Sequence, residues 1–238
     1  MAKKIDHDFW EKYFKVYDVL NYVIPYQELL DTIVEKLEIK EGDLVLDAGC
    51  GTGNLAIKMK EKGARVIGLD NCDEALDRCR EKCSNTEIVA SNLTEKLPFP
   101  DNYFDKIAAN NVVYTLDKQI RIKLFNEFYR TLKPTGILVV SDAHVGFKPI
   151  KIYFDTIKIQ NELTGFFETV KLILKLVVPT VKMLIYNKQL VSQSEKGSLD
   201  FIEPQEHIEL MRSTGFSEIS ENINVYSDQA TLNKCKKM

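Results

Sequence analysis

The chain has 238 residues, enough for one domain or for one domain with a lid. Hydrophobic residues make up 45% and charged residues 28%, which excludes a collagen-like, low-complexity or largely disordered chain. The 32 Lys and Arg residues against 35 Asp and Glu residues give a formal net charge of -3, so no overall basic field is present to hold nucleic acid.

The five cysteines are an odd number and show no framework typical of small secreted proteins, so we expect a cytoplasmic protein. The first residues mix charged with aromatic side chains and lack the apolar stretch of a secretory signal. Cys72, Cys79 and Cys83 lie close in sequence, but a zinc site needs four ligands in recognisable pairs. We therefore predict no metal.

Predicted helices and strands alternate along the first part of the chain. Apolar residues recur at helical spacing over 9–37 with a break near 21–25, which predicts two helices. A strand at 44–46 then leads into a glycine-rich loop and a helix that starts at Asn54. The alternation continues with strands at 65–69, 87–90, 106–109 and 137–140 and helices at 74–82 and 119–132. Such alternation predicts an open, doubly wound, mostly parallel, Rossmann-like α/β sheet.

The pattern changes after Ser141. Residues 147–190 are mainly helical in pattern and include a strongly apolar stretch, 170–186, which three lysines interrupt and Pro179 is expected to break. It is therefore not predicted to span a membrane. Seven apolar residues fit one helical face and predict a packed lid: Val170, Ile173, Leu174, Val177, Val181, Leu184 and Ile185. A helix at 204–213 and strands at 217–221 and 224–227 follow.

These elements predict four parts of the chain. An N-terminal helical cap, residues 1–40, precedes a Rossmann-like core, residues 41–146. A helical insertion that covers the acceptor, residues 147–196, follows the fifth strand, and the C-terminal helix and closing strands, residues 197–238, complete the core.

The segment VLDAGCGTG, residues 45–53, combines an acidic strand end with three alternating glycines. Gly49, Gly51 and Gly53 allow the backbone to approach a ligand closely, and the N-terminus of the next helix offers N–H groups to an anionic group. Asp47 would lie unfavourably beside a pyrophosphate but could hold an ammonium group. A zwitterionic ligand suits both features.

Two more residues narrow the choice of ligand. A nicotinamide fingerprint G-x-G-x-x-G needs a third glycine where this chain has Asn54, which weakens the dinucleotide interpretation. Asp70 ends the second strand, VIGLD, where a carboxylate can accept hydrogen bonds from both ribose hydroxyls. Adenosine joined to an amino acid fits both observations.

VLDAGCGTG, VIGLD, EKLPFPDNYFDKI and RTLKPTGILVVSD resemble, in order and spacing, the class I S-adenosylmethionine-dependent methyltransferases over roughly residues 40–142. LPFPDNYFD, together with YDVLN at 17–21, is similar to the ubiquinone and menaquinone biosynthesis methyltransferase-like branch. The resemblance implies that Asp47, Gly49 and Gly51 surround the methionine moiety and that Asp70 binds the ribose hydroxyls. Gly53 of the same loop is also expected to belong to the cofactor site.

The resemblance also implies contacts around the adenine and at the methyl end of the cofactor. The residues concerned are Tyr17, Asn71, Asn92, Leu93, Asn110 and Asn111. Asn92 stands where the family often has an acidic residue, and an amide oxygen can still accept a hydrogen bond from the adenine amine. Tyr17 is either a lid over the cofactor or an aromatic residue that packs the N-terminal helix.

Methyl transfer from a sulfonium needs alignment and exclusion of water more than it needs a general base. If the acceptor must lose a proton, His144, just after the fifth strand, is the best-placed candidate, and Asp142 is the second. His7 and His207 lie in polar contexts and are expected to be solvated.

Residues 148–196 hold eight Lys and four acidic residues, which suits weak attachment to an anionic membrane surface, although a solvated lysine edge over an apolar lid is favoured. An apolar lid favours a hydrophobic acceptor. We therefore predict an S-adenosylmethionine-dependent methyltransferase for a small, hydrophobic, lipid-like acceptor, without a nucleic acid partner. A homodimer and peripheral membrane contact stay open, as do a non-catalytic S-adenosylmethionine-binding protein and a nicotinamide-dependent oxidoreductase.

Overall fold

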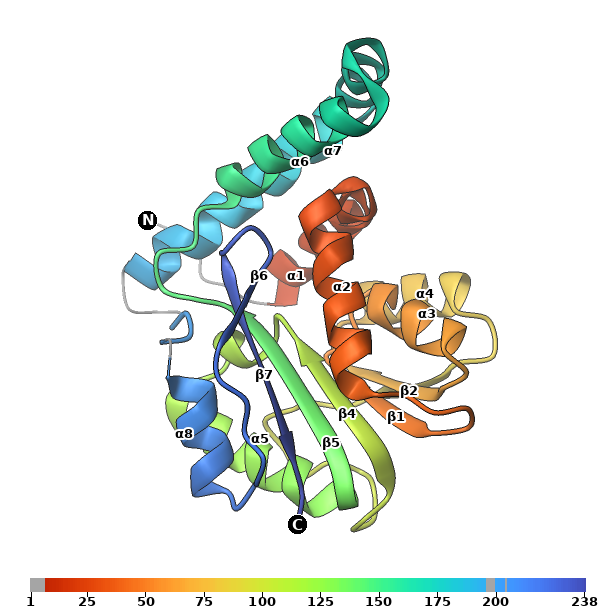
Figure 1. Ribbon diagram of the computed structural model, residues 1–238, viewed down its shortest axis with the longest axis vertical. Coiled ribbons are helices and arrows are strands. Elements are labelled where there is room, and N and C mark those ends of the chain that lie inside the picture. The colour runs from red at the N-terminus through yellow and green to blue at the C-terminus, as the bar shows by residue number, and fades with distance from the viewer. Residues whose placement is uncertain (1–6, 196–199, 204) are drawn as a thin grey trace.

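The computed structural model describes residues 7–195, 200–203 and 205–238. Its strands form one sheet in the order β3-β2-β1-β4-β5-β7-β6 (Figure 1). The strands span Leu44–Ala48 (β1), Arg65–Asp70 (β2), Glu87–Ala90 (β3), Phe104–Asn110 (β4), Leu132–Ala143 (β5), Ile223–Val225 (β6) and Ala230–Lys236 (β7). The first five pair in parallel, and β7 runs antiparallel to both β5 and β6. The predicted doubly wound, mostly parallel sheet is confirmed.

The register brings the predicted ligand-binding residues to one edge of the sheet. Asp47 of β1 lies opposite Gly68 of β2 and Ala108 of β4. Asp70 and Asn110 end β2 and β4. Because the strands are parallel, their carboxyl ends meet at the crevice where open α/β sheets bind ligands.

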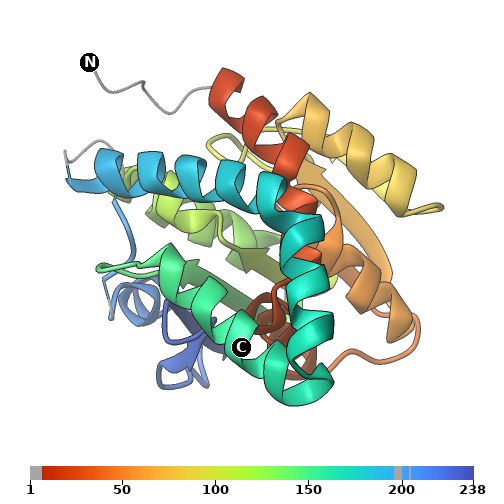
Figure 2. The same ribbon diagram turned by 90° about the horizontal axis from the view of Figure 1, so that it is seen from above.

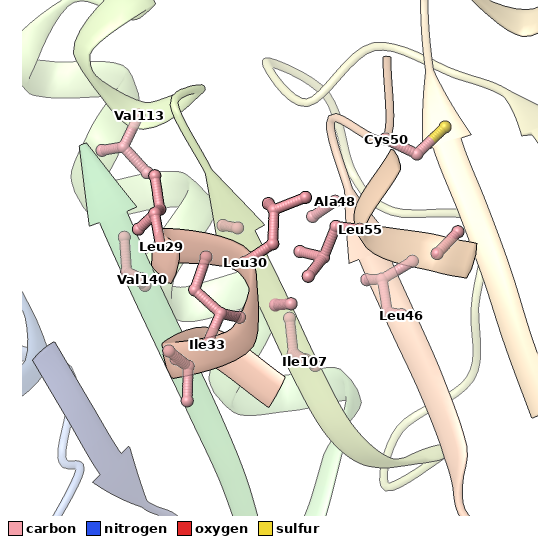
Figure 3. Packing of buried hydrophobic residues seen from close by; sticks show 14 of the residues in the cluster. Leu29, Leu30, Ile33, Leu46, Ala48, Cys50, Leu55, Ile107, Val113 and Val140 are labelled. Carbon is pink, nitrogen blue, oxygen red and sulfur yellow. The ribbon is translucent and has the colours of Figure 1, made fainter. Parts of the chain in front are cut away.

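Helices cover both faces of the sheet. They are α1 (His7–Tyr17), η1 (Asp18–Tyr22), α2 (Ile24–Leu37), α3 (Asn54–Glu61), α4 (Asp73–Lys82), η2 (Val113–Thr115), α5 (Lys118–Thr131), α6 (Pro149–Thr164), α7 (Phe166–Glu195) and α8 (Glu206–Ser213). Helices α2 and α3 pack on one face, with α5 and α8 on the other (Figure 1). Leu29, Leu30 and Ile33 of α2 lie over Ile107 of β4 and Val140 of β5, and all five side chains are buried (Figure 3). The core beneath the site is therefore a dry helix-on-sheet layer.

The expected break between the first two helices is a short 3-10 turn, η1, and α2 resumes at Ile24. Pro25 lies in the first turn of α2, where its missing N–H costs no helical hydrogen bond. The proline thus marks the start of the second helix.

Of the two strands expected near the C-terminus, the one at 224–227 overlaps β6, whereas the one at 217–221 does not form. Ser217 makes only an isolated bridge to Lys236. Strand β7 was missed because buried polar residues, Thr231 and Asn233, interrupt its apolar alternation. The helix expected at 204–213 is α8, and its first expected residue, Pro204, lies outside the described residues.

Two expectations about the apolar stretch 170–186 are wrong. Helix α7 continues through Pro179 and is bent along its length (Figure 2), because proline removes one backbone hydrogen bond and can kink a helix without ending it. The predicted inward face also includes Leu174, Val181 and Ile185, which are exposed, whereas Met183 is buried. In the described part of the chain, no helix is long and apolar enough to cross a membrane.

Candidate active site

The glycine loop after β1 is packed too tightly for side chains. A Cβ atom at Gly49, where φ is 75°, would lie 2.6 Å from Cγ2 of Val112. At Gly53, where φ is 80°, it would lie 2.6 Å from the Sγ atoms of both Cys79 and Cys83. Glycine meets both demands, because it has no Cβ and adopts positive φ without strain.

The loop borders a cavity of about 70 Å³, here called the inner cavity. Its floor is formed by polar residues at strand ends and at the start of α3: Asp47, Asn54, Asn110 and Asn111. Three atoms of this floor are buried and find no hydrogen-bond partner among the described residues: Asp47 Oδ2, Asn54 Nδ2 and Asn110 Oδ1. Such orphaned polar atoms cost free energy unless a ligand or water pairs with them.

Asp47 supplies the carboxyl group of the floor. Its side chain is 2% exposed, and burial, together with the nearby Cys83 and Asp70, raises its pKa to about 8. A cationic ligand group beside the free Oδ2 would reverse that effect, because an opposite charge favours the ionised carboxylate.

Asn54 is fixed so that its donor faces the cavity. Lys82 of α4 donates to its Oδ1 over 2.5 Å and also donates to Asp18 of η1 over 2.6 Å. Thr52 donates to the same Asp18 oxygen over 2.8 Å. This network ties the N-terminal helices to the glycine loop and directs the amide N–H₂ of Asn54 toward the Tyr26 hydroxyl and the inner cavity, where it can also meet an anionic group.

Beside the inner cavity is an outer cleft of about 320 Å³, which shares Gly49 and Trp10 with it. Asp70 lines the cleft and accepts three backbone hydrogen bonds, from Gly51 (2.9 Å), Asn71 (2.8 Å) and Cys72 (3.0 Å). Burial raises the pKa of this carboxyl, and these three bonds oppose the shift. Asp70 therefore anchors the glycine loop in addition to facing the cleft.

The roof of the inner cavity is aromatic and comes from distant parts of the chain. Trp10, Tyr13, Phe14 and Tyr17 of α1 line it together with Tyr26, Tyr114, Phe147 and Tyr226. The Tyr13 hydroxyl donates to Asn187 of α7 over 3.4 Å, and the hydroxyls of Tyr17 and Tyr26 lie 3.3 Å apart. Burial raises the pKa of Tyr26 to about 12, so its phenol stays protonated at neutral pH.

Comparison with known proteins agrees with this geometry. Residues 45–136 match the family described as "Methyltransferase domain". The chain is 31% identical over 152 residues to "Putative methyltransferase YqeM" of Bacillus subtilis, covering 62% of this chain and 60% of that protein. Residues 45–136 form a methyltransferase domain.

A second relative of this methyltransferase domain is "Demethylmenaquinone methyltransferase" of Listeria monocytogenes, 32% identical over 148 residues, 58% of this chain and 61% of that protein. The chain thus spans about three fifths of the length of these two relatives. The magnesium protoporphyrin IX methyltransferase of Synechocystis with bound SAH superposes with a TM-score of 0.63 at 15% identity, over 95% of this chain and 93% of that one. At this identity, the likeness establishes the shared fold.

The floor of the methyltransferase domain fits the amino-acid end of S-adenosylmethionine. That end bears an ammonium group and a carboxylate. The orphaned Asp47 Oδ2 and Asn110 Oδ1 accept hydrogen bonds, and the orphaned Asn54 Nδ2 donates them. The site therefore offers both acceptors and a donor to a zwitterion.

The structure divides the predicted cofactor residues between the two spaces. Those at the inner cavity are Tyr17, Asp47, Gly49, Gly51, Asn110 and Asn111, and those at the outer cleft are Gly49, Asp70, Asn71, Asn92 and Leu93. Gly53 lines neither and packs against the α4 thiols. Sequence reasoning missed Asn54 as a donor because it was judged only against a glycine fingerprint. It also missed the aromatic roof, which forms through contacts between distant segments.

The two candidate bases do not face the inner cavity. The ring nitrogens of His144 lie 2.8 Å from the carbonyl oxygens of Val145 and Asp228. Asp142 is fully buried and accepts a hydrogen bond from the Tyr114 backbone N–H over 3.2 Å. The geometry therefore gives no support to a catalytic role for either, and that role stays a prediction.

The expectation that His207 is solvated is wrong. The ring is fully buried, with its nitrogens 3.1 Å from Asp142 Oδ2 and 3.1 Å from Asn233 Oδ1. It joins α8 to β5 and β7, a structural task that the surrounding polar sequence did not reveal. His7, by contrast, is exposed, as expected. Within the described residues, no cluster of His, Cys, Asp or Glu is arranged to hold a metal ion.

Proposed function

We propose that this chain transfers the methyl group of S-adenosylmethionine to a small hydrophobic acceptor. The observation that carries the proposal is the inner cavity, where Asp47, Asn54 and Asn110 keep unsatisfied polar atoms beneath an aromatic roof. A binding site for a zwitterion explains why these atoms remain unpaired within the protein. The family match and the relatives described above support the same activity.

Each residue has a defined task in this proposal. Asp47 accepts hydrogen bonds from the ammonium group, and Asn54 donates to the carboxylate. Asp70 accepts a hydrogen bond from a ribose hydroxyl with the lone pair of Oδ2 that its three backbone bonds leave free. Further contacts come from the rest of the two spaces: Tyr17, Gly49, Gly51, Asn71, Asn92, Leu93, Asn110 and Asn111.

When bound, S-adenosylmethionine supplies a methyl group activated by a sulfonium, so the protein must mainly align the acceptor and exclude water. The aromatic roof serves both tasks. No Lys, Arg or His is among the described residues that line the inner cavity. The nucleophilic atom of the acceptor must therefore react without a basic Lys, Arg or His beside it: an electron-rich carbon, a heteroatom lone pair, or a hydroxyl acidic enough to have lost its proton to water.

An apolar cavity of about 140 Å³ lies between η1, α6 and α7 and supports a hydrophobic acceptor. Tyr153 lines it with a buried hydroxyl that finds no partner among the described residues. The same tyrosine is close enough to Tyr13 and Tyr226 of the inner cavity to raise the pKa of each, although burial is the largest cause of both shifts. Val19 of this cavity and Leu20 of the inner cavity follow each other in η1, so the two cavities are neighbours. In this proposal residues 1–40 and 147–196 act as the cap and lid over residues 41–146, with residues 197–238 closing the sheet.

The test is incubation of the purified protein with methyl-labelled S-adenosylmethionine and an extract of the source cells. Protein-dependent label in the organic phase is expected. Label only in the aqueous or protein fraction would refute a hydrophobic acceptor but keep methyl transfer. No label in any fraction, with cofactor binding intact, would favour a non-catalytic binding protein. Binding of a nicotinamide cofactor in its place would favour an oxidoreductase.

A further inference from the structure

The outer surface of α7 bears a long apolar stripe that faces solvent. It consists of Phe167, Leu174, Val178, Val181 and Ile185, with exposed fractions of 78, 70, 61, 48 and 61%. Spacings of seven, four, three and four residues place these side chains on one helical face. We call this set the α7 stripe. A solvent-facing apolar row of this size is unusual in a monomeric protein and marks a contact surface.

The hairpin of α6 and α7 extends beyond the rest of the fold (Figure 1). Its turn adds Leu163 and Phe166, which are 71% and 67% exposed, to the end of the stripe. The apolar surface thus lies on an element that can meet a broad, flat partner without collision with the sheet domain.

Lysines flank the α7 stripe. Lys171, Lys175, Lys182 and Lys188 are exposed, and residues 169–194 include no Asp or Glu. At 100° per residue, Lys171, Lys175 and Lys182 project on one side of the stripe and Lys188 on the other. Lys171 pairs with Glu168, and the Lys175 ammonium lies 5.3 Å from the centre of the Tyr22 ring. Long lysine stems can lie along an apolar surface while their ammonium groups reach a charged layer.

The apolar stripe and its flanking lysines together indicate which partner binds this surface. A second copy of α7 would set lysines against lysines along most of the stripe, because residues 169–194 contain no acid, and like charges at such a contact oppose association. An anionic phospholipid surface offers hydrocarbon to the stripe and phosphate oxygens to the lysines at matching depths. We propose that the α7 stripe docks the protein in the plane of an anionic lipid surface.

Docking also places the apolar cavity at the lipid. Ile173, Val177 and Val181 line that cavity, and Val181 is part of the α7 stripe. A lipid-dissolved acceptor would enter beside the docked helix, and this consequence alone rests on the proposed function. The docking itself requires neither S-adenosylmethionine nor an acceptor.

The test is co-sedimentation of the full chain with phosphatidylcholine vesicles, with or without about 30% phosphatidylglycerol. Binding at least about tenfold stronger to the anionic vesicles is expected, and high salt should weaken it because exposed charges are screened. The double variant Leu174→Glu with Val178→Glu should lose that binding. Ile122→Glu is the matched control, because Ile122 is also exposed but lies on α5. Circular dichroism checks that each variant is folded.

Replacement of Lys171, Lys175 and Lys182 by Gln should reduce the preference for anionic vesicles by about fivefold per lysine. Equal binding to both vesicles, or no binding, would overturn the proposal. A dimer in analytical ultracentrifugation that Leu174→Glu dissociates would overturn it in favour of a second copy. The vesicles contain no acceptor, so failure of methyl transfer cannot affect this result, and loss of docking leaves cofactor binding measurable.

Discussion

The floor and the roof of the inner cavity differ in whether their polar atoms are satisfied within the protein. On the floor, Asp47 and Asn54 keep buried atoms without partners among the described residues. In the roof, the Tyr13 hydroxyl reaches Asn187, and the hydroxyls of Tyr17 and Tyr26 meet each other. The floor therefore carries a free-energy cost that a bound ligand or water offsets, whereas the polar groups of the roof are paired within the protein. Substitutions in the floor should affect binding strongly, and those in supporting groups should affect mainly stability.

The largest expected effect is the loss of stability in a variant that disturbs the packing beneath the glycine loop. Gly53→Ala should lower the free energy of unfolding by about 3 kcal/mol, because the new methyl group meets two buried sulfurs at a positive φ. Gly42→Ala is the matched control, with a φ of 83° but no atom within 4 Å of the added Cβ, and should lose about 1 kcal/mol. Urea unfolding measures both. Equal losses would show that the packing beneath the loop is not tight.

Asp47→Asn separates ligand binding from stability. It should weaken S-adenosylmethionine binding by about 1.5 to 3 kcal/mol, because a charged hydrogen bond is lost. Burial raises the pKa of Asp47 from an ordinary value of 3.8 to about 8, so the folded state favours the neutral carboxyl. The resulting stability is fully present below about pH 4 and is lost progressively as pH rises from there to about 8. The variant should therefore become more stable than wild type across this window, by at least about 1 kcal/mol at its upper end. Lower stability there would contradict the assignment.

Asp70→Ala should weaken S-adenosylmethionine binding by about 1 to 3 kcal/mol, through loss of ribose contacts and of the bond to Gly51. Asp77→Ala is the control, because Asp77 is an exposed acid of α4 outside the outer cleft. Calorimetric titration compares the two. Unchanged affinity in Asp70→Ala would refute the ribose assignment.

The pH dependence of binding tests the same floor without a mutation. Below its pKa of about 8, Asp47 must release a proton before it can pair with an ammonium group. Affinity should therefore rise with pH between about 6 and 7.5, by up to about tenfold per unit, or about 1.4 kcal/mol. Calorimetry in buffers of different ionisation enthalpy measures the proton released. A flat profile in wild type would place the ammonium group elsewhere.

The smallest expected effect is that of His144→Ala on turnover. Both ring nitrogens are engaged by backbone carbonyls, so kcat should change by less than about threefold. Stability should fall by about 1 kcal/mol, because the ring joins β5 to the segment before β7. A loss of kcat of a hundredfold or more, with the fold intact, would restore the catalytic assignment.

The sequence predicted those features of the fold and the site that depend on short stretches of chain. The glycine loop, Asp47 and Asp70 follow from local motifs, and the parallel sheet follows from alternation. The contact between Tyr13 and Asn187 joins α1 to α7 and has no local signal. His207 was misjudged because its partners, Asp142 and Asn233, lie on distant strands. The outward side of α7 was misjudged because that helix is apolar on several faces.

The central claim is that the floor holds the zwitterionic end of S-adenosylmethionine. Calorimetric titration with S-adenosylhomocysteine at about pH 7.5 tests it most directly, because this product keeps the amino-acid end and lacks the reactive methyl group. We expect one site per chain, at least about tenfold weaker in Asp47→Asn and unchanged in His144→Ala. No binding to wild type, or equal binding to Asp47→Asn, would contradict the account.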